Sequence, residues 1–208
     1  MDKEVYLYVC AGMADWEPAL AIAMISTTNA DYPKKKTYKV TTFGLNTQPV
    51  RTIGGVNILP DADLHNVDVS NAAMLIIPGA NVFIKSDVPE LVPLVKACAQ
   101  NKIPVAAICG GTLFLARNGF LDTVKHTSLG PKWLKKMAPS YRGEKNYVHK
   151  PSVSDGGFIT ASIFGNVEFA YDILKNLEVF PAEYLKVWLT AYKNGYANLD
   201  PFLGIDSE

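Results

Sequence analysis

The stretch IPVAAICGGTLFLARNGFL, residues 103–121, decides how the chain folds. It opens with a short apolar run that ends at Cys109, and two glycines follow directly. Beyond the glycines, apolar residues recur at helical spacing. A short run of this composition predicts a buried strand, and the glycines permit a sharp turn into the helix that follows. The stretch therefore predicts a strand–turn–helix unit with Cys109 at the turn.

The same alternation continues on both sides of this unit. Further strands are predicted at VYLYVC, YKVTTFGL, AAMLIIPGA and the two flanks of the Asp-Gly-Gly turn at 155–157, with a short hairpin over 50–58. Helices are predicted at 14–29, 88–102, 131–137, 168–179 and 181–199. In the first of them Asp15 is the expected N-cap and Pro18 falls in the first turn. Strands that are apolar on both faces and alternate with helices indicate an α/β fold with a mostly parallel sheet.

Length and composition favour one globular domain. The chain has 208 residues, of which 49% are hydrophobic, and its formal net charge is zero. We expect an α/β domain over 1–178 and a helical extension over 179–208 packed on it. The neutral charge argues against a nucleic-acid partner, and no apolar stretch reaches the roughly 18 residues that span a bilayer. Three cysteines, with no Cys/His spacing typical of a metal site, predict a cytoplasmic protein without a metal.

Three features fall where predicted strands end. Glu17 follows the first strand, Gly79 ends the AAMLIIPGA strand, and Cys109 ends the IPVAAIC strand. In open parallel sheets the ligand crevice lies at this edge. A helix beginning at Gly110 would favour the thiolate of Cys109, and the N–H groups of Gly79 and Gly110 could stabilise an oxyanion. The alternative is a buried structural cysteine whose glycines only allow close packing.

Glu17 and His126 are the candidate proton-transfer groups. A desolvated Glu17 would have a raised pKa and could hydrogen-bond to the thiol, whereas a solvated glutamate at a helix start needs no function. His126 could act as a general acid or base, but a single histidine near a loop is more often a surface or core residue. Neither His65 nor His149 receives a role.

At this point several segments together resemble the ThiJ/PfpI family, within the class I glutamine-amidotransferase-like superfamily. They are the elbow AAICGGTLFLARNGFLD, the upstream LIIPGA, the early ADWE and the late DGGFITAS…GNVEFAYDILKNL. The resemblance runs from about Val5 to Leu177. It implies a flavodoxin-like three-layer sandwich that forms a homodimer, with Cys109 as the reactive thiol and Glu17 as its protonated partner. It also implies oxyanion contacts from Gly79 and Gly110, and a histidine at the position of His126.

Two departures narrow the function that the resemblance implies. Peptidase-like members carry a histidine directly after the nucleophile, where this chain has Gly110. Glutamine amidotransferases have a Gly-x-Cys-x-Gly elbow, where this chain has Ala107 at the first glycine. We therefore expect a cofactor-free cysteine hydrolase or glyoxalase-like lyase acting on a small carbonyl or amide compound. The alternatives are a redox or stress-response protein with an oxidisable Cys109, a chaperone-like binding module, and an intracellular peptidase or amidase.

Overall fold

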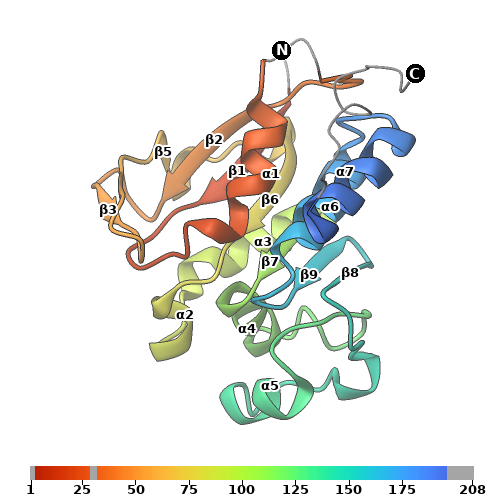
Figure 1. Ribbon diagram of the computed structural model, residues 1–208. Helices are drawn as coiled ribbons and strands as arrows, with labels where there is room; N and C mark the ends of the chain where they lie inside the picture. Colours follow the sequence, from red (N-terminus) through yellow and green to blue (C-terminus); the bar gives the residue numbers. More distant parts are fainter. Residues whose placement is uncertain (1–2, 29–31, 196–208) are drawn as a thin grey trace, which may run out of the picture.

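The computed structural model describes residues 3–28 and 32–195, and its centre is a seven-stranded sheet (Figure 1). In spatial order the strands are β5 (Ala62–Asp63), β2 (Lys39–Gly44), β1 (Glu4–Tyr8), β6 (Ala72–Ile77), β7 (Val105–Ile108), β9 (Phe158–Ala161) and β8 (Ser152–Asp155). Only the edge strand β8 runs antiparallel to its neighbour. This confirms the predicted α/β fold with a mostly parallel sheet.

Helices cover both faces of this sheet, which makes a flavodoxin-like three-layer sandwich (Figure 1). On one face lie α1 (Trp16–Ser26), α6 (Asn166–Leu177) and α7 (Ala182–Asn194), with α6 between the other two. On the other face α3 (Val92–Gln100) and α4 (Gly110–Arg117) contact β7, while α2 (Asn81–Lys85) and α5 (Pro131–Met137) contact α4. The central strands are almost completely buried because both of their faces are covered.

The predicted hairpin is present as the antiparallel pair β3 (Val50–Arg51) and β4 (Asn57–Ile58). Its loop is tied to the start of α1, because the Asp15 carboxylate accepts a 2.7 Å hydrogen bond from the Gly54 N–H. The predicted N-cap role of Asp15 is wrong: the residue has helical dihedral angles and makes no side-chain capping bond. Its carboxylate instead holds the hairpin loop against the helix start.

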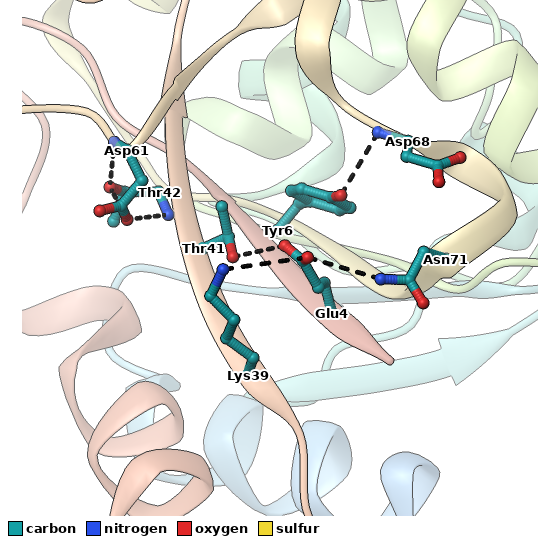
Figure 2. A network of polar contacts seen from close by, with 8 residues as sticks. All are labelled: Glu4, Tyr6, Lys39, Thr41, Thr42, Asp61, Asp68 and Asn71. Atoms are coloured by element: carbon teal, nitrogen blue, oxygen red, sulfur yellow. Dashed lines mark hydrogen bonds and ion pairs between the residues drawn. The ribbon is translucent and has the colours of Figure 1, made fainter. Parts of the chain in front are cut away.

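A polar network fixes the beginning of β1 against its neighbours (Figure 2). The Glu4 carboxylate accepts hydrogen bonds from Thr41 on β2 and from Asn71, which precedes β6, and it pairs with Lys39 at 4.0 Å. Near it, the Tyr6 hydroxyl accepts from the Asp68 N–H at 3.3 Å. Because these bonds join β1 to segments on both sides, they help to set the register of the central strands.

The helix predicted at 181–199 is observed over Ala182–Asn194, and the end of the prediction lies outside the described residues. Leu185 and Trp188 are buried against the chain's own structure, and α7 packs on α6. The apolar face of the helix is thus used within the protomer. The predicted domain division at residue 178 and the predicted homodimer both stay predictions.

Candidate functional site at Cys109

Cys109 lies in a strained turn between β7 and α4. Its dihedral angles, φ 53° and ψ −119°, are unusual for any residue other than glycine. Such strain persists only where the surroundings hold the backbone firmly, and it often marks a functional site. The Cys109 N–H donates to the Ala161 carbonyl at 3.1 Å, and the side chain is partly exposed, unlike the buried Cys10 and Cys98. The predicted strand–turn–helix unit is therefore present.

Two buried hydroxyls lock the other side of this turn. The Cys109 carbonyl accepts from the Thr112 N–H at 3.1 Å and from the Thr112 hydroxyl at 2.6 Å. The Thr112 oxygen also lies 2.6 Å from the hydroxyl oxygen of Ser128. Since the single Thr112 hydroxyl proton goes to the carbonyl, Ser128 is the donor in this second bond. The strained backbone is thus held by hydrogen bonds on both sides of Cys109.

Glu17 reaches this turn from the first turn of α1. Its side chain is completely buried, and one carboxylate oxygen, Oε2, accepts a 2.5 Å hydrogen bond from the Gly79 N–H. A Cβ atom built on Gly79 would lie 2.6 Å from Glu17 Oε2 and 2.8 Å from Cys109 Cβ. The carboxyl group and the cysteine therefore meet directly over Gly79. Within the described residues, the other oxygen, Oε1, has no hydrogen-bond partner. A contact between Glu17 and the Cys109 thiol contributes to the pKa of both groups.

The Gly79 N–H was predicted to bind an oxyanion, whereas in the structure it donates to the Glu17 carboxylate. The Gly110 N–H, at the start of α4, is directed to the Cys109 sulfur, where it acts to lower the thiol pKa. Next to it, the Ala80 nitrogen lies 3.2 Å from where a Gly110 Cβ would be. Among the described residues no acceptor takes the Ala80 N–H. The oxyanion roles predicted for Gly79 and Gly110 stay predictions, and Ala80 adds a third N–H group in the cavity lining.

Burial dominates the electrostatics of this pair. It raises the pKa of Glu17, in the predicted direction. It also raises the pKa of the Cys109 thiol to about 12, and the negative charge of Glu17 adds to that rise. The Gly110 N–H at the helix start acts in favour of the thiolate, as expected, whereas burial and the Glu17 charge oppose it, so a thiolate at Cys109 stays a prediction. Desolvation and the repulsion between two negative charges disfavour the state in which both groups are ionised.

A cavity of about 140 Å³ opens in front of the thiol. Its lining is mostly apolar, and Glu17 is the single charged residue among those that line it. The residues are Gly12, Ala14, Trp16, Glu17, Ile53, Gly79, Ala80, Asn81, Ile84, Cys109 and Ile163. They come from loops and short elements that follow β1, β6, β7 and β9, together with the hairpin loop. The carboxyl ends of these strands thus form the crevice that the sequence predicted.

The structure places His126 away from this lining. The side chain is fully buried, and its ring lies edge-on to Tyr141 and Tyr147. Nδ1 donates to the Val124 carbonyl at 2.8 Å, and Nε2 lies 2.6 Å from the Tyr141 hydroxyl, from which it accepts in the neutral tautomer. Both ring nitrogens are therefore occupied, and a proton-transfer role for His126 stays a prediction that these contacts do not favour.

The contacts of His126 predict a pH-dependent stability. Burial lowers its pKa, so below about pH 6.5 the unfolded chain takes up a proton that the folded chain resists. The free energy of unfolding should then fall as the pH falls through this range. In urea titrations we expect His126→Gln to be less stable than the wild type by about 1–3 kcal/mol at pH 8, because a buried hydrogen bond is lost.

The difference in the free energy of unfolding between the wild type and His126→Gln should become smaller toward pH 5. The wild type loses stability there because His126 takes up a proton on unfolding, whereas the variant has no histidine at this position. Contributions from Glu17 and Asp172, whose pKa values burial raises, cancel in the difference between the two proteins. A gap that stays constant from pH 8 to pH 5 would show that His126 does not resist protonation.

The three thiols should also differ in reactivity. Burial raises the pKa of Cys10 to about 12 and that of Cys98 to about 11, so the thiolate fraction does not favour Cys109 over them. Access does, because only Cys109 borders the cavity. A short iodoacetamide pulse at neutral pH, read by peptide mass spectrometry, should label Cys109 at least ten times faster than either other cysteine. Equal labelling of all three would contradict this order.

Within residues 3–28 and 32–195, no three His, Cys, Asp or Glu side chains are grouped so as to hold a metal ion. In the same residues, no helix is both long and apolar enough to cross a bilayer.

Several residues at the site escaped the sequence analysis. Ile53, Ile84 and Ile163 carry no motif, and the role of Ala80 at the end of LIIPGA was not predicted. The short helix α2, which supplies Asn81 and Ile84, was also not predicted. Of these residues, only Ile53 could have been found from the sequence, because an apolar residue in a hairpin loop indicates that the loop packs against another part of the protein.

Comparison with known proteins places this geometry in a family. Residues 3–176 match the model of the DJ-1/PfpI family. A Bacillus subtilis protein named "Uncharacterized protease YoaZ" is 35% identical over 186 residues, which cover 89% of each chain. A second B. subtilis protein, "Uncharacterized protease YdeA", is 29% identical and spans 94% of this chain and 92% of its own.

Solved structures agree with the sequence matches. The thiJ/pfpI family protein from Bacillus anthracis has a TM-score of 0.86 at 34% identity, covering 99% of this chain and 95% of its own. The DJ-1 superfamily protein Atu0886 from Agrobacterium tumefaciens has a TM-score of 0.80 at 31% identity, covering 92% and 100%. The strained cysteine, the buried glutamate and the strand order thus occur in a chain that belongs to the DJ-1/PfpI family.

Proposed function

We propose that the protein is a cofactor-free cysteine enzyme that acts on a small carbonyl or amide compound. The observation that carries the proposal is the contact between the buried Glu17 carboxyl group and the Cys109 thiol at the end of a cavity. A buried carboxylate without a cationic partner is costly, and strongly shifted groups in a cleft are candidates for catalysis. Strain at Cys109 supports the same reading.

The proposed reaction begins with proton transfer from the Cys109 thiol to Glu17. The sulfur then forms a bond to the carbonyl carbon, and the C=O π electrons move to the oxygen. The N–H groups of Gly110 and Ala80 stabilise that oxygen, and Glu17 can return the proton to it or to a leaving group. A carboxylate with a raised pKa is a better base than an ordinary one, which suits it to this step.

The names of the B. subtilis relatives raise peptidase activity as an alternative. Two features favour a small substrate over a polypeptide. The cavity at Cys109 is small, with a volume of about 140 Å³. In addition, Gly110 stands directly after the cysteine, so no histidine from that position can activate the thiol.

A redox or stress-response role is the second candidate. The contacts of His126 favour this role. Both of its ring nitrogens already have hydrogen-bond partners, so His126 is not free to transfer a proton to or from a substrate. In that case Cys109 would be oxidised selectively and no substrate would be converted. If the protein is a chaperone-like binding module, replacing Cys109 should not change its binding activity.

The test is turnover of small dicarbonyls and amides by the wild type and by Cys109→Ser. We expect conversion of at least one dicarbonyl by the wild type and loss to the background rate in the variant, because the serine hydroxyl is a far weaker nucleophile here. Casein should stay intact. Cysteine-dependent cleavage of casein would support the peptidase alternative, and selective oxidation of Cys109 without any turnover would support the redox alternative.

A further inference from the structure

A second and larger cavity adjoins the one at Cys109. It has a volume of about 430 Å³, against about 140 Å³ in front of the thiol. Ile163, which follows β9, lines both cavities and so stands at their junction. The remaining lining residues are Thr127, Ser128, Leu129, Gly130, Tyr147, His149, Lys150, Pro151, Ser162 and Phe164.

The two cavities differ in charge. The lining of the larger one includes Lys150 and His149, and none of the described residues that form it is an aspartate or glutamate. In residues 3–28 and 32–195 the Lys150 ammonium group has no ion-pair partner. The cavity at Cys109 has the opposite character, since Glu17 is the one charged residue that lines it. An anionic group would therefore be favoured in the larger cavity and repelled at the thiol.

The larger cavity also offers apolar contact at its edge. Phe164 is 89% exposed and Leu129 is 39% exposed, although both side chains are large and hydrophobic. The Ser162 hydroxyl, also in the lining, makes no hydrogen bond with the described residues. A ligand with an apolar body and a polar end can use all of these groups together.

From these observations we infer that the larger cavity is a second subsite for the distal part of the substrate. The inference rests on the proposed function and narrows its substrate class. The substrate is an elongated carbonyl or amide compound that is uncharged at its reactive end. Beyond a short apolar section that passes Ile163 it carries an anionic group, which Lys150 and His149 bind.

Alkylation of Cys109 by matched probes tests this without requiring turnover. In each reaction the sulfur bonds to the iodomethyl carbon, iodide leaves and the thiol proton goes to solvent. The probes are N-butyl iodoacetamide and 4-(iodoacetamido)butanoate, which differ in a distal carboxylate, together with iodoacetamide and iodoacetate. Each rate is divided by that of glutathione with the same probe, which removes intrinsic reactivity.

At low ionic strength we expect the distal carboxylate to accelerate labelling by about two- to fivefold over the butyl probe. Salt should reduce this advantage. Iodoacetate, whose charge would lie beside Glu17, should be slower than iodoacetamide by a similar or larger factor. In Lys150→Gln the advantage of the distal carboxylate should disappear. In Lys145→Gln, a control in the same segment that does not line the cavity, it should remain.

Two results would overturn the inference: no acceleration by the distal carboxylate, or an acceleration that persists in Lys150→Gln. The same experiments distinguish failure of the subsite from failure of the proposed enzymatic function. If dicarbonyls are turned over through Cys109 while the probes show no preference, the function stands and the subsite is lost. If the probe preferences hold but nothing is turned over, the subsite stands and the enzymatic proposal fails.

Discussion

Glu17→Gln is expected to lower kcat/KM for a small carbonyl substrate by about 100- to 10,000-fold, the range that loss of a general base produces. The glutamine has nearly the same shape, and its oxygen can still accept the Gly79 N–H that now holds Oε2. What it lacks is a site for the thiol proton. Because the cavity offers no second charged group, no described side chain in its lining can replace Glu17.

The same substitution should have the opposite effect on simple alkylation. Burial is the main cause of the raised Cys109 pKa, and the Glu17 charge is the next. Removing that charge, and placing an amide N–H beside the sulfur, should lower the thiol pKa. At neutral pH iodoacetamide should then label Cys109 faster in Glu17→Gln than in the wild type, and the midpoint of the rate–pH profile should shift to lower pH.

Opposite changes in the turnover rate and the labelling rate would show that Glu17 acts on the thiol proton. A merely structural role for Glu17 would slow both or change neither. Glu183→Gln, on the exposed face of α7, serves as the control and should leave both rates unchanged. If Glu17→Gln instead slows alkylation, the proton already resides on Glu17 in the resting protein and the thiolate is the resting form of Cys109.

Gly79→Ala is expected to reduce kcat/KM by about 100-fold or more, since misplacement by about 1 Å can cost that much. The new methyl group would lie 2.6 Å from Glu17 Oε2 and 2.8 Å from Cys109 Cβ, both closer than real Cβ contacts allow. The cysteine cannot yield because its backbone is held on both sides. Glu17 must therefore move, and it loses its bond to the Gly79 N–H.

Gly110→Ala is the matched comparison for this prediction. Its methyl group would meet Ala80 atoms at 3.1 and 3.2 Å, which is tight but requires only small shifts. We expect a smaller loss of activity there. Urea unfolding should show that Gly79→Ala costs about 1–3 kcal/mol, the usual range for overpacking, and leaves the protein folded. Activity of Gly79→Ala within threefold of the wild type would mean that the contact over Gly79 is not needed.

Much of the fold could be predicted because its signals are local. Apolar runs with β-branched residues gave β1, β6 and β7, and helical spacing gave α3, α6 and α7. The glycines at 156 and 157 marked the turn between β8 and β9, which both residues form with positive φ. These features depend on residues within one turn or one strand, so the order of residues along the chain is enough to reveal them.

The convergence of Glu17, Gly79 and Cys109 could also be predicted, because parallel strands bring their carboxyl ends to one edge. The sequence alone therefore determined the fold class and the family resemblance, and it named the residues that meet at this edge as candidates for a site. It could not determine how their polar groups are paired. The N–H of Gly79 binds Glu17, the N–H of Ala80 has no acceptor within the described residues, and His126 is held by Val124 and Tyr141.

Only the tertiary structure decided the direction of the thiol pKa and the shape of the cavities. The helix N-terminus is visible in the sequence, but the surroundings of Cys109 are built by distant segments, among them the hairpin loop at Ile53, helix α2 at Ile84 and the segment after β9 at Ile163. Desolvation and charge–charge interactions act through space, and their strength depends on distances that no spacing along the chain encodes. For that reason the sequence identified Cys109 as the candidate nucleophile, whereas its contact with Glu17 and the proposed second subsite follow from how the loops and α2 pack.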